Sequence, residues 1–174
     1  MIIEILYIVL RFVLLMAIQV LVLNNVQLGG MINPFLYVMF LLTLPIQIPK
    51  LLLLAIAFVT GLTIDVFQNT MGMHASACLL MAYLRPGWLK MIAPRDGYEA
   101  DASPGIRKFG LRWFIVYCSV MLLIHHVLLF NIEMFRFSEF FNTLTRAILS
   151  SLVTLVLIVI SQYLTAKPTD RNLS

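Results

Sequence analysis

The stretch Ile5–Leu23, which reads ILYIVLRFVLLMAIQVLVL, decides the fold of this chain, and Arg11 is its only charged residue. A helix needs roughly 20 mainly apolar residues to cross the hydrocarbon core of a membrane, so this run predicts a spanning helix. The whole chain agrees, because 61% of its 174 residues are hydrophobic and only 11% are charged. A soluble fold of this composition would lack the polar residues needed to cover its surface. These proportions exclude an ordinary cytosolic enzyme, a secreted disulfide-rich domain and a disordered chain.

Further apolar segments of similar length follow, and short polar stretches with Pro or Gly separate them. The predicted fold is therefore an all-α integral membrane protein. It forms a single compact bundle of six transmembrane helices over residues 1–164, followed by a polar tail at 165–174. Arg85-Pro86-Gly87 interrupts the fourth segment, so we expect that helix to be kinked or short. The expected spans are 5–23, 33–48, 50–67, 73–92, 111–132 and 139–164.

The basic residues predict the orientation, because Lys and Arg near span ends accumulate on the cytoplasmic side. With the N-terminus inside, almost all of those outside the spans fall on the inner side and Arg136 alone falls outside. Both termini and the loop 85–112 are therefore expected to be cytoplasmic. The loop is either a topology signal that attracts anionic lipid headgroups or a docking surface for a protein, and its interleaved acidic residues argue against nucleic acid. The candidate docking residues are Arg85, Lys90, Arg95, Arg107, Lys108 and Arg112.

Polar and ionisable residues fall in the outer halves of several predicted spans, where an unpaired charge costs a few kcal/mol or more. We expect them to form an outward-facing polar cluster in which Asp65 pairs with Arg146 or with a histidine. Such a cluster is either a binding or signalling site or an ion-pair lock between helix ends, and the lock is the simpler interpretation. The cluster comprises Asn24, Asn25, Asp65, His74, His125, His126 and Arg146.

The residue patterns of the chain do not predict an enzyme or a metal site. His125 and His126 are adjacent, so their side chains leave a helix about 100° apart and do not converge on one ion. The chain contains neither the H-E-x-x-H spacing of zinc proteases nor the G-x-S-x-G spacing of serine hydrolases. We therefore expect no catalytic residue, no metal and no cofactor.

Small residues mark one face of the third predicted span. Ala57 and Gly61 are four residues apart, a spacing that lets two helices approach closely. This face serves either packing within the bundle or contact with the helix of a partner, and the sequence leaves both interpretations open. If a partner uses it, a bulky residue at Gly61 is expected to weaken the association.

Several motifs along the chain are distinctive together. The most specific is Gly61-Leu62-Thr63-Ile64-Asp65-Val66-Phe67, followed by Gly72-Met73-His74-Ala75. Others are Leu21-Val22-Leu23-Asn24-Asn25, Ile32-Asn33-Pro34-Phe35-Leu36-Tyr37, Ala82-Tyr83-Leu84-Arg85-Pro86 and His125-His126-Val127-Leu128-Leu129-Phe130. In this order they resemble the rod shape-determining protein MreD family, over nearly the whole chain.

The resemblance implies a non-catalytic scaffold of the cell-elongation machinery in the bacterial inner membrane, which maintains cell shape. Members of this family associate with the bitopic protein MreC. Through MreC they join MreB, RodA and an elongation-specific penicillin-binding transpeptidase, which build side-wall peptidoglycan. The expected fold is similar to the S-components of energy-coupling-factor transporters.

That similarity in fold supports a second hypothesis, a small-molecule-binding membrane subunit of a transporter with the outer polar cluster as its pocket. A ligand that raises the thermal stability of the protein favours the transporter subunit, because binding to the folded state alone stabilises it. Copurification of MreC favours the scaffold.

Overall fold

The computed structural model describes residues 2–26, 31–134 and 140–165, and the regular elements in these ranges are all helices. Four of them, α1, α3, α5 and α6, are long and apolar enough to cross a membrane. The chain is therefore an all-α, multi-pass membrane protein, as its sequence predicts. The predicted start of the last span and most of the predicted tail lie outside the described residues. The elements are α1 (Ile2–Leu21), the 3₁₀ helix η1 (Leu23–Asn25), α2 (Val38–Leu42), α3 (Lys50–Gln68), α4 (Met73–Met91), α5 (Ile106–Met134) and α6 (Phe140–Leu164).

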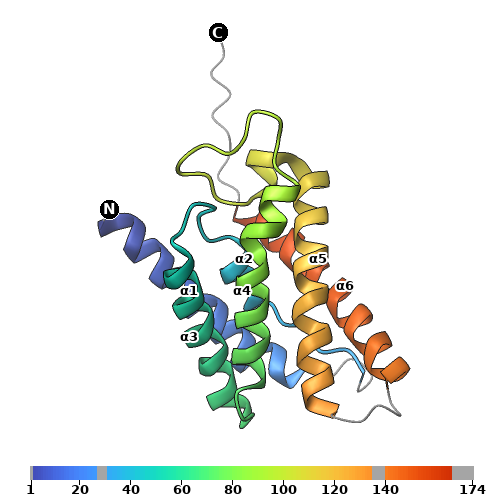
Figure 1. Ribbon diagram of the computed structural model, residues 1–174. Coiled ribbons are helices and arrows are strands. Elements are labelled where there is room, and N and C mark those ends of the chain that lie inside the picture. The colour runs from blue at the N-terminus through green and yellow to red at the C-terminus, as the bar shows by residue number, and fades with distance from the viewer. Residues whose placement is uncertain (1, 27–30, 135–139, 166–174) are drawn as a thin grey trace.

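Helices α3 to α6 pack in chain order, each against the next (Figure 1). Helix α1 is held less closely: its first turns lean away from the bundle, and many of its apolar side chains are exposed. The start of α1, the loop 92–105 and the end of α6 lie at one end of the bundle, which we call the N-terminal end. The turn between α3 and α4 lies at the opposite end, which we call the far end.

The segment 33–48 differs from its prediction as a spanning helix. Only Val38–Leu42 forms a helix, and all five of these side chains are buried. Pro34 and Pro45 flank this short helix, and a proline lacks the backbone N–H that would continue a helical ladder. The segment passes through the interior of the bundle from the far end to the N-terminal end (Figure 1). An apolar run alone does not distinguish this buried, broken crossing from a helix.

Side chains of neighbouring helices satisfy the non-helical backbone of this crossing. The N–H of Asn33 donates to Ser150 Oγ at 3.0 Å, and the N–H of Phe35 donates to Thr154 Oγ1 at 3.0 Å. The N–H of Tyr37 donates to Gln19 Oε1 at 3.4 Å. Irregular backbone is stable at membrane depth only where protein surrounds it and supplies such partners. Polar residues of α1 and α6 therefore make the broken crossing possible.

Helix α4 continues through Arg85-Pro86-Gly87 to Met91, so the connecting loop is 92–105 rather than 85–112. The prediction of Arg85 as an exposed docking residue is wrong, because its side chain is fully buried. Its guanidinium donates to Tyr117 Oη at 2.8 Å and to the carbonyl oxygens of Leu44 and Pro45. These carbonyl oxygens follow the C-terminal end of α2 and have no partner within a helix. The guanidinium can satisfy them, because it carries a positive charge and several N–H donors.

Helix α5 contains a break at Gly110, whose φ of 81° lies in the left-handed region that favours glycine. Residues Ile106–Phe109 form a short helical turn before this break. The long part of α5 starts after it, at the position where the sequence predicts the fifth span to begin.

Candidate functional site

The turn between α3 and α4 is organised by Asp65. Its carboxylate accepts hydrogen bonds from Thr70 Oγ1, from the N–H of His74 at 3.0 Å and from the N–H of Ala75 at 2.9 Å. The first N–H groups of a helix have no partner within it, and an acid there also favours the positive end of the helix dipole. Asp65 is therefore the residue that caps α4, although it lies in α3, three residues before the end of its own helix.

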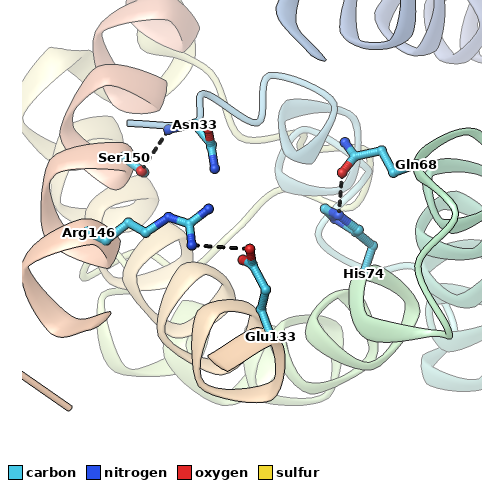
Figure 2. A network of polar contacts seen from close by, with 6 residues as sticks. All are labelled: Asn33, Gln68, His74, Glu133, Arg146 and Ser150. Atoms are coloured by element: carbon cyan, nitrogen blue, oxygen red, sulfur yellow. Dashed lines mark hydrogen bonds and ion pairs between the residues drawn. The ribbon is translucent and has the colours of Figure 1, made fainter. Parts of the chain in front are cut away.

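The predicted ion pair of Asp65 with Arg146 is wrong. Arg146 Nη1 instead donates to Glu133 Oε1 at 3.1 Å (Figure 2). The guanidinium of Arg146 also lies over the ring of Phe130. The Asn33 side-chain amide, with its oxygen toward Arg146, accepts from Nη2 at 2.6 Å. The carboxylate of Asp65 is satisfied by the backbone of α4. A sequence shows which charges need partners but not which partner the fold supplies.

Two histidines meet at a buried tyrosine. Tyr37 Oη lies 2.9 Å from His74 Nδ1 and 2.8 Å from His125 Nε2, and all three side chains are buried. On its other side, His74 Nε2 lies 3.2 Å from the side-chain oxygen Oε1 of Gln68 (Figure 2). We call Tyr37, His74 and His125 the histidine network. Sequence reasoning missed Tyr37, because a tyrosine in an apolar run reads as core filling.

The hydrogen bonds of the histidine network have a definite direction. Because Gln68 offers an oxygen, His74 Nε2 is the donor there, and in a neutral ring His74 Nδ1 then accepts from the Tyr37 hydroxyl. The tyrosine oxygen in turn accepts from His125 Nε2. His125 Nδ1 has no hydrogen-bond partner among the described residues. Each group thus donates to the next in the order His125, Tyr37, His74 and Gln68.

The rest of the predicted outer cluster separates into different environments. His126 is buried and lies 2.8 Å from the carbonyl oxygen of Leu122 and 3.3 Å from Thr154 Oγ1. Asn25 is exposed and donates to the carbonyl oxygen of Leu21. The structure thus joins Asn24, His74 and His125 in one chain of hydrogen bonds through Gln68 and leaves Asn25 outside it. Among the described residues, no three His, Cys, Asp or Glu side chains are placed to hold a metal ion.

A cleft of about 340 Å³ lies next to the histidine network at the far end of the bundle. Four side-chain amides line it, and three of them are bonded together: Asn24 Oδ1 accepts from Gln19 Nε2 at 2.9 Å and from Gln68 Nε2 at 2.9 Å. Gln19 Nε2 also donates to the carbonyl oxygen of Pro34. We call this site the amide cleft. Its lining comprises Gln19, Leu23, Asn24, Asn33, Pro34, Phe35, Phe67 and Gln68.

Of the predicted outer cluster, only Asn24 lines the amide cleft. Sequence reasoning concentrated on ionisable residues and so passed over the two glutamines. Gln19 carried a signal, since it is an uncharged polar residue in a span whose only charged residue is Arg11, and a polar group within the membrane needs a buried partner.

The small residues of α3 lie inside the bundle. Ala57 and Gly61 are both buried, and α3 packs closely against α4 there. A Cβ atom at Gly61 would lie only 2.6 Å from the backbone N of Ala75 and from the carbonyl oxygen of His74. In this structure the pair therefore serves internal packing, and a bulky residue at Gly61 does not test a partner surface.

The remaining predicted docking residues, Lys90, Arg95, Arg107, Lys108 and Arg112, are exposed at the N-terminal end. Lys108 Nζ lies 2.7 Å from Glu99 Oε2, and this hydrogen bond and charge hold the pKa of Glu99 below its usual value. The loop itself is fixed to the bundle, because Tyr98 Oη donates to the carbonyl oxygen of Leu89 at 2.8 Å.

An apolar groove of about 370 Å³ runs between α1 and α3, with α2 at its floor. Its walls carry no charged side chain, so it suits an apolar occupant within the membrane. We call it the α1–α3 groove. It is lined by Ile8, Val9, Phe12, Phe40, Ala55, Ile56, Val59 and Thr60.

Comparison with known protein families, with curated proteins and with solved structures found no match for this chain.

Proposed function

We infer that the chain is a non-catalytic scaffold of the bacterial cell-elongation machinery. In this role it links MreC and the cytoskeletal MreB to the side-wall peptidoglycan synthases RodA and an elongation-specific penicillin-binding transpeptidase. The observation that carries the proposal is the resemblance of two motifs to the MreD family, Gly61-Leu62-Thr63-Ile64-Asp65-Val66-Phe67 and the Gly72-Met73-His74-Ala75 that follows it. Its bacterial inner-membrane location, with both termini in the cytoplasm, belongs to the same proposal.

The α1–α3 groove supports a scaffold role by offering a place for a partner helix. MreC is bitopic, so the part of it that reaches the groove is a single apolar helix. Helices in a membrane associate by close packing rather than by exclusion of water, and a groove offers more packing area than a convex face. The groove is open at the surface, because the lining side chains of Val9 and Val59 are exposed.

The test is to fill the groove and measure partner binding. Val59→Trp places an indole where a partner helix would lie, and we expect it to reduce the MreC that copurifies in mild detergent by about tenfold. Val156→Trp, on the exposed face of α6, is the matched control. The two valines are 55% and 57% exposed, so both substitutions add the same bulk on a lipid-facing surface.

Each variant must first show wild-type expression and an unchanged unfolding midpoint, so that a loss of MreC reports on the groove. If wild-type protein recovers MreC and Val59→Trp recovers it equally, the groove is not the docking site. If the wild-type protein recovers no MreC or wall synthase from its native membranes, the scaffold proposal itself is wrong.

A further inference from the structure

We propose that the amide cleft binds a neutral, oxygen-rich ligand of the size of a monosaccharide. The cleft is a separate site from the α1–α3 groove, and this proposal does not depend on the scaffold role. Its volume of about 340 Å³ falls at the lower end of the range of about 300–1,000 Å³ for small-molecule sites.

The lining sets the charge of the ligand. The side chains that line the amide cleft are amides or apolar groups, and none of them is charged. The nearby Arg146 already has two partners, because it pairs with Glu133 (Figure 2) and donates to the side-chain oxygen of Asn33. A charged ligand would lose its hydration here without gaining a counter-ion, whereas a neutral one exchanges only hydrogen bonds.

The hydrogen bonds among the amides of the cleft determine which of their N–H groups and oxygens remain available to a ligand. Asn24 Oδ1 is fully used, because it accepts from both Gln19 and Gln68. Its Nδ2 group donates to no described residue, and Gln68 Nε2 has a second hydrogen without an acceptor among them. The cleft therefore offers N–H donors, which call for hydroxyl or carbonyl oxygens on the ligand.

These donors are held in place before any ligand arrives. The histidine network fixes the side-chain oxygen Oε1 of Gln68 through His74 Nε2, so the side-chain nitrogen of Gln68 faces Asn24. Gln19 is fixed in turn by the N–H of Tyr37 and the carbonyl oxygen of Pro34. Preorganised donors cost less entropy on binding than flexible ones. Phe67, 63% exposed beside the amides, offers an aromatic face to the C–H groups of a sugar ring.

The test is thermal unfolding of the full chain in phosphatidylcholine nanodiscs, with uncharged and charged sugars as probes. Glucose and N-acetylglucosamine are expected to raise Tm in a saturable manner, because a ligand of the folded state stabilises it. Gluconate and glucosamine, which carry charges at neutral pH, are expected to leave Tm unchanged. Equal stabilisation by charged and neutral probes, or no shift with any neutral probe, overturns the proposal.

Asn24→Asp locates the site. The aspartate keeps an oxygen for Gln19 and Gln68 but replaces the free Nδ2 donor by a negative oxygen, and we expect about a tenfold or larger loss of affinity for the neutral probe. Asn25→Asp is the matched control. It is the same substitution one residue away, at a side chain that does not line the cleft. Equal loss in both variants, or no loss in Asn24→Asp, assigns the binding elsewhere and contradicts the proposal.

The same chemistry is available from a free sugar or from the headgroup of a glycosylated lipid. Nanodiscs that contain a glucosyl lipid separate these sources. If the lipid raises Tm in the wild type but not in Asn24→Asp, the headgroup occupies the cleft. If only soluble sugars do so, the ligand comes from the aqueous side.

Discussion

At the scale of the residue, Gly61 has the strictest requirement in the chain. Its neighbours are backbone atoms of α4, which cannot turn aside as a side chain can. We expect Gly61→Ala to lower the free energy of unfolding by about 1–3 kcal/mol, because α3 and α4 must move apart. Gly87→Ala is the control, since its Cβ meets nothing within 4 Å and alanine favours a helix. Equal unfolding midpoints in detergent for the two variants would show that the α3–α4 contact is looser than described.

The charges of Asp65 and Arg146 give a second prediction at this scale. Because they have different partners, the effects of Asp65→Asn and Arg146→Gln on stability are expected to add within about 0.5 kcal/mol. Glu133→Gln and Arg146→Gln remove the two halves of one ion pair, so we expect a coupling of up to about 1 kcal/mol between them. Double-mutant cycles on the unfolding midpoint measure both. Coupling in the first cycle and additivity in the second would restore the pairing that the sequence suggests.

At the scale of the element, α2 depends on a residue far away in the chain. Arg85 donates to two carbonyl oxygens beyond the end of α2, and Tyr117 Oη donates to a third, that of Leu42. Arg85→Met leaves these buried oxygens with fewer donors, and we expect a loss of at least about 2 kcal/mol of stability. Lys90→Met, five residues further along α4 and exposed, also removes a positive charge and is expected to leave stability nearly unchanged. Titration of each variant with a denaturing detergent measures the two free energies of unfolding, which can then be compared.

The helices also show where sequence patterns were sufficient to predict a membrane span. Long apolar runs predicted α1, α3, α5 and α6, because a run of about 20 such residues has few alternatives in a membrane. The same rule was wrong for the segment 33–48. The N–H groups of Asn33, Phe35 and Tyr37 are satisfied by Ser150, Thr154 and Gln19, which lie on other helices, so nothing within the segment itself indicates these partners. Whether a segment within the membrane is helical or irregular thus depends on side chains far away in sequence that can bond its backbone.

At the scale of the whole molecule, the same limitation applies to the candidate site. The sequence indicated that polar residues gather at one end of the bundle, and Asn24, His74 and His125 do join there through Gln68 and Tyr37. Which residues line a cleft depends on how the helices and the broken segment 33–48 pack together, and local sequence patterns do not specify that packing. The orientation of that end relative to the membrane, by contrast, is predicted by the distribution of Lys and Arg alone.

This orientation can be tested with two single cysteines. Met71 is 99% exposed in the turn at the far end, and Asp101 is exposed in the loop at the N-terminal end. The native Cys78 and Cys118 are buried, so they contribute little background. Because the basic residues at the N-terminal end favour the cytoplasm, a membrane-impermeant maleimide is expected to label Met71→Cys in intact bacterial cells, and Asp101→Cys only after permeabilisation. The reverse pattern would place the amide cleft in the cytoplasm, where a ligand would have to come from metabolism rather than from outside the cell.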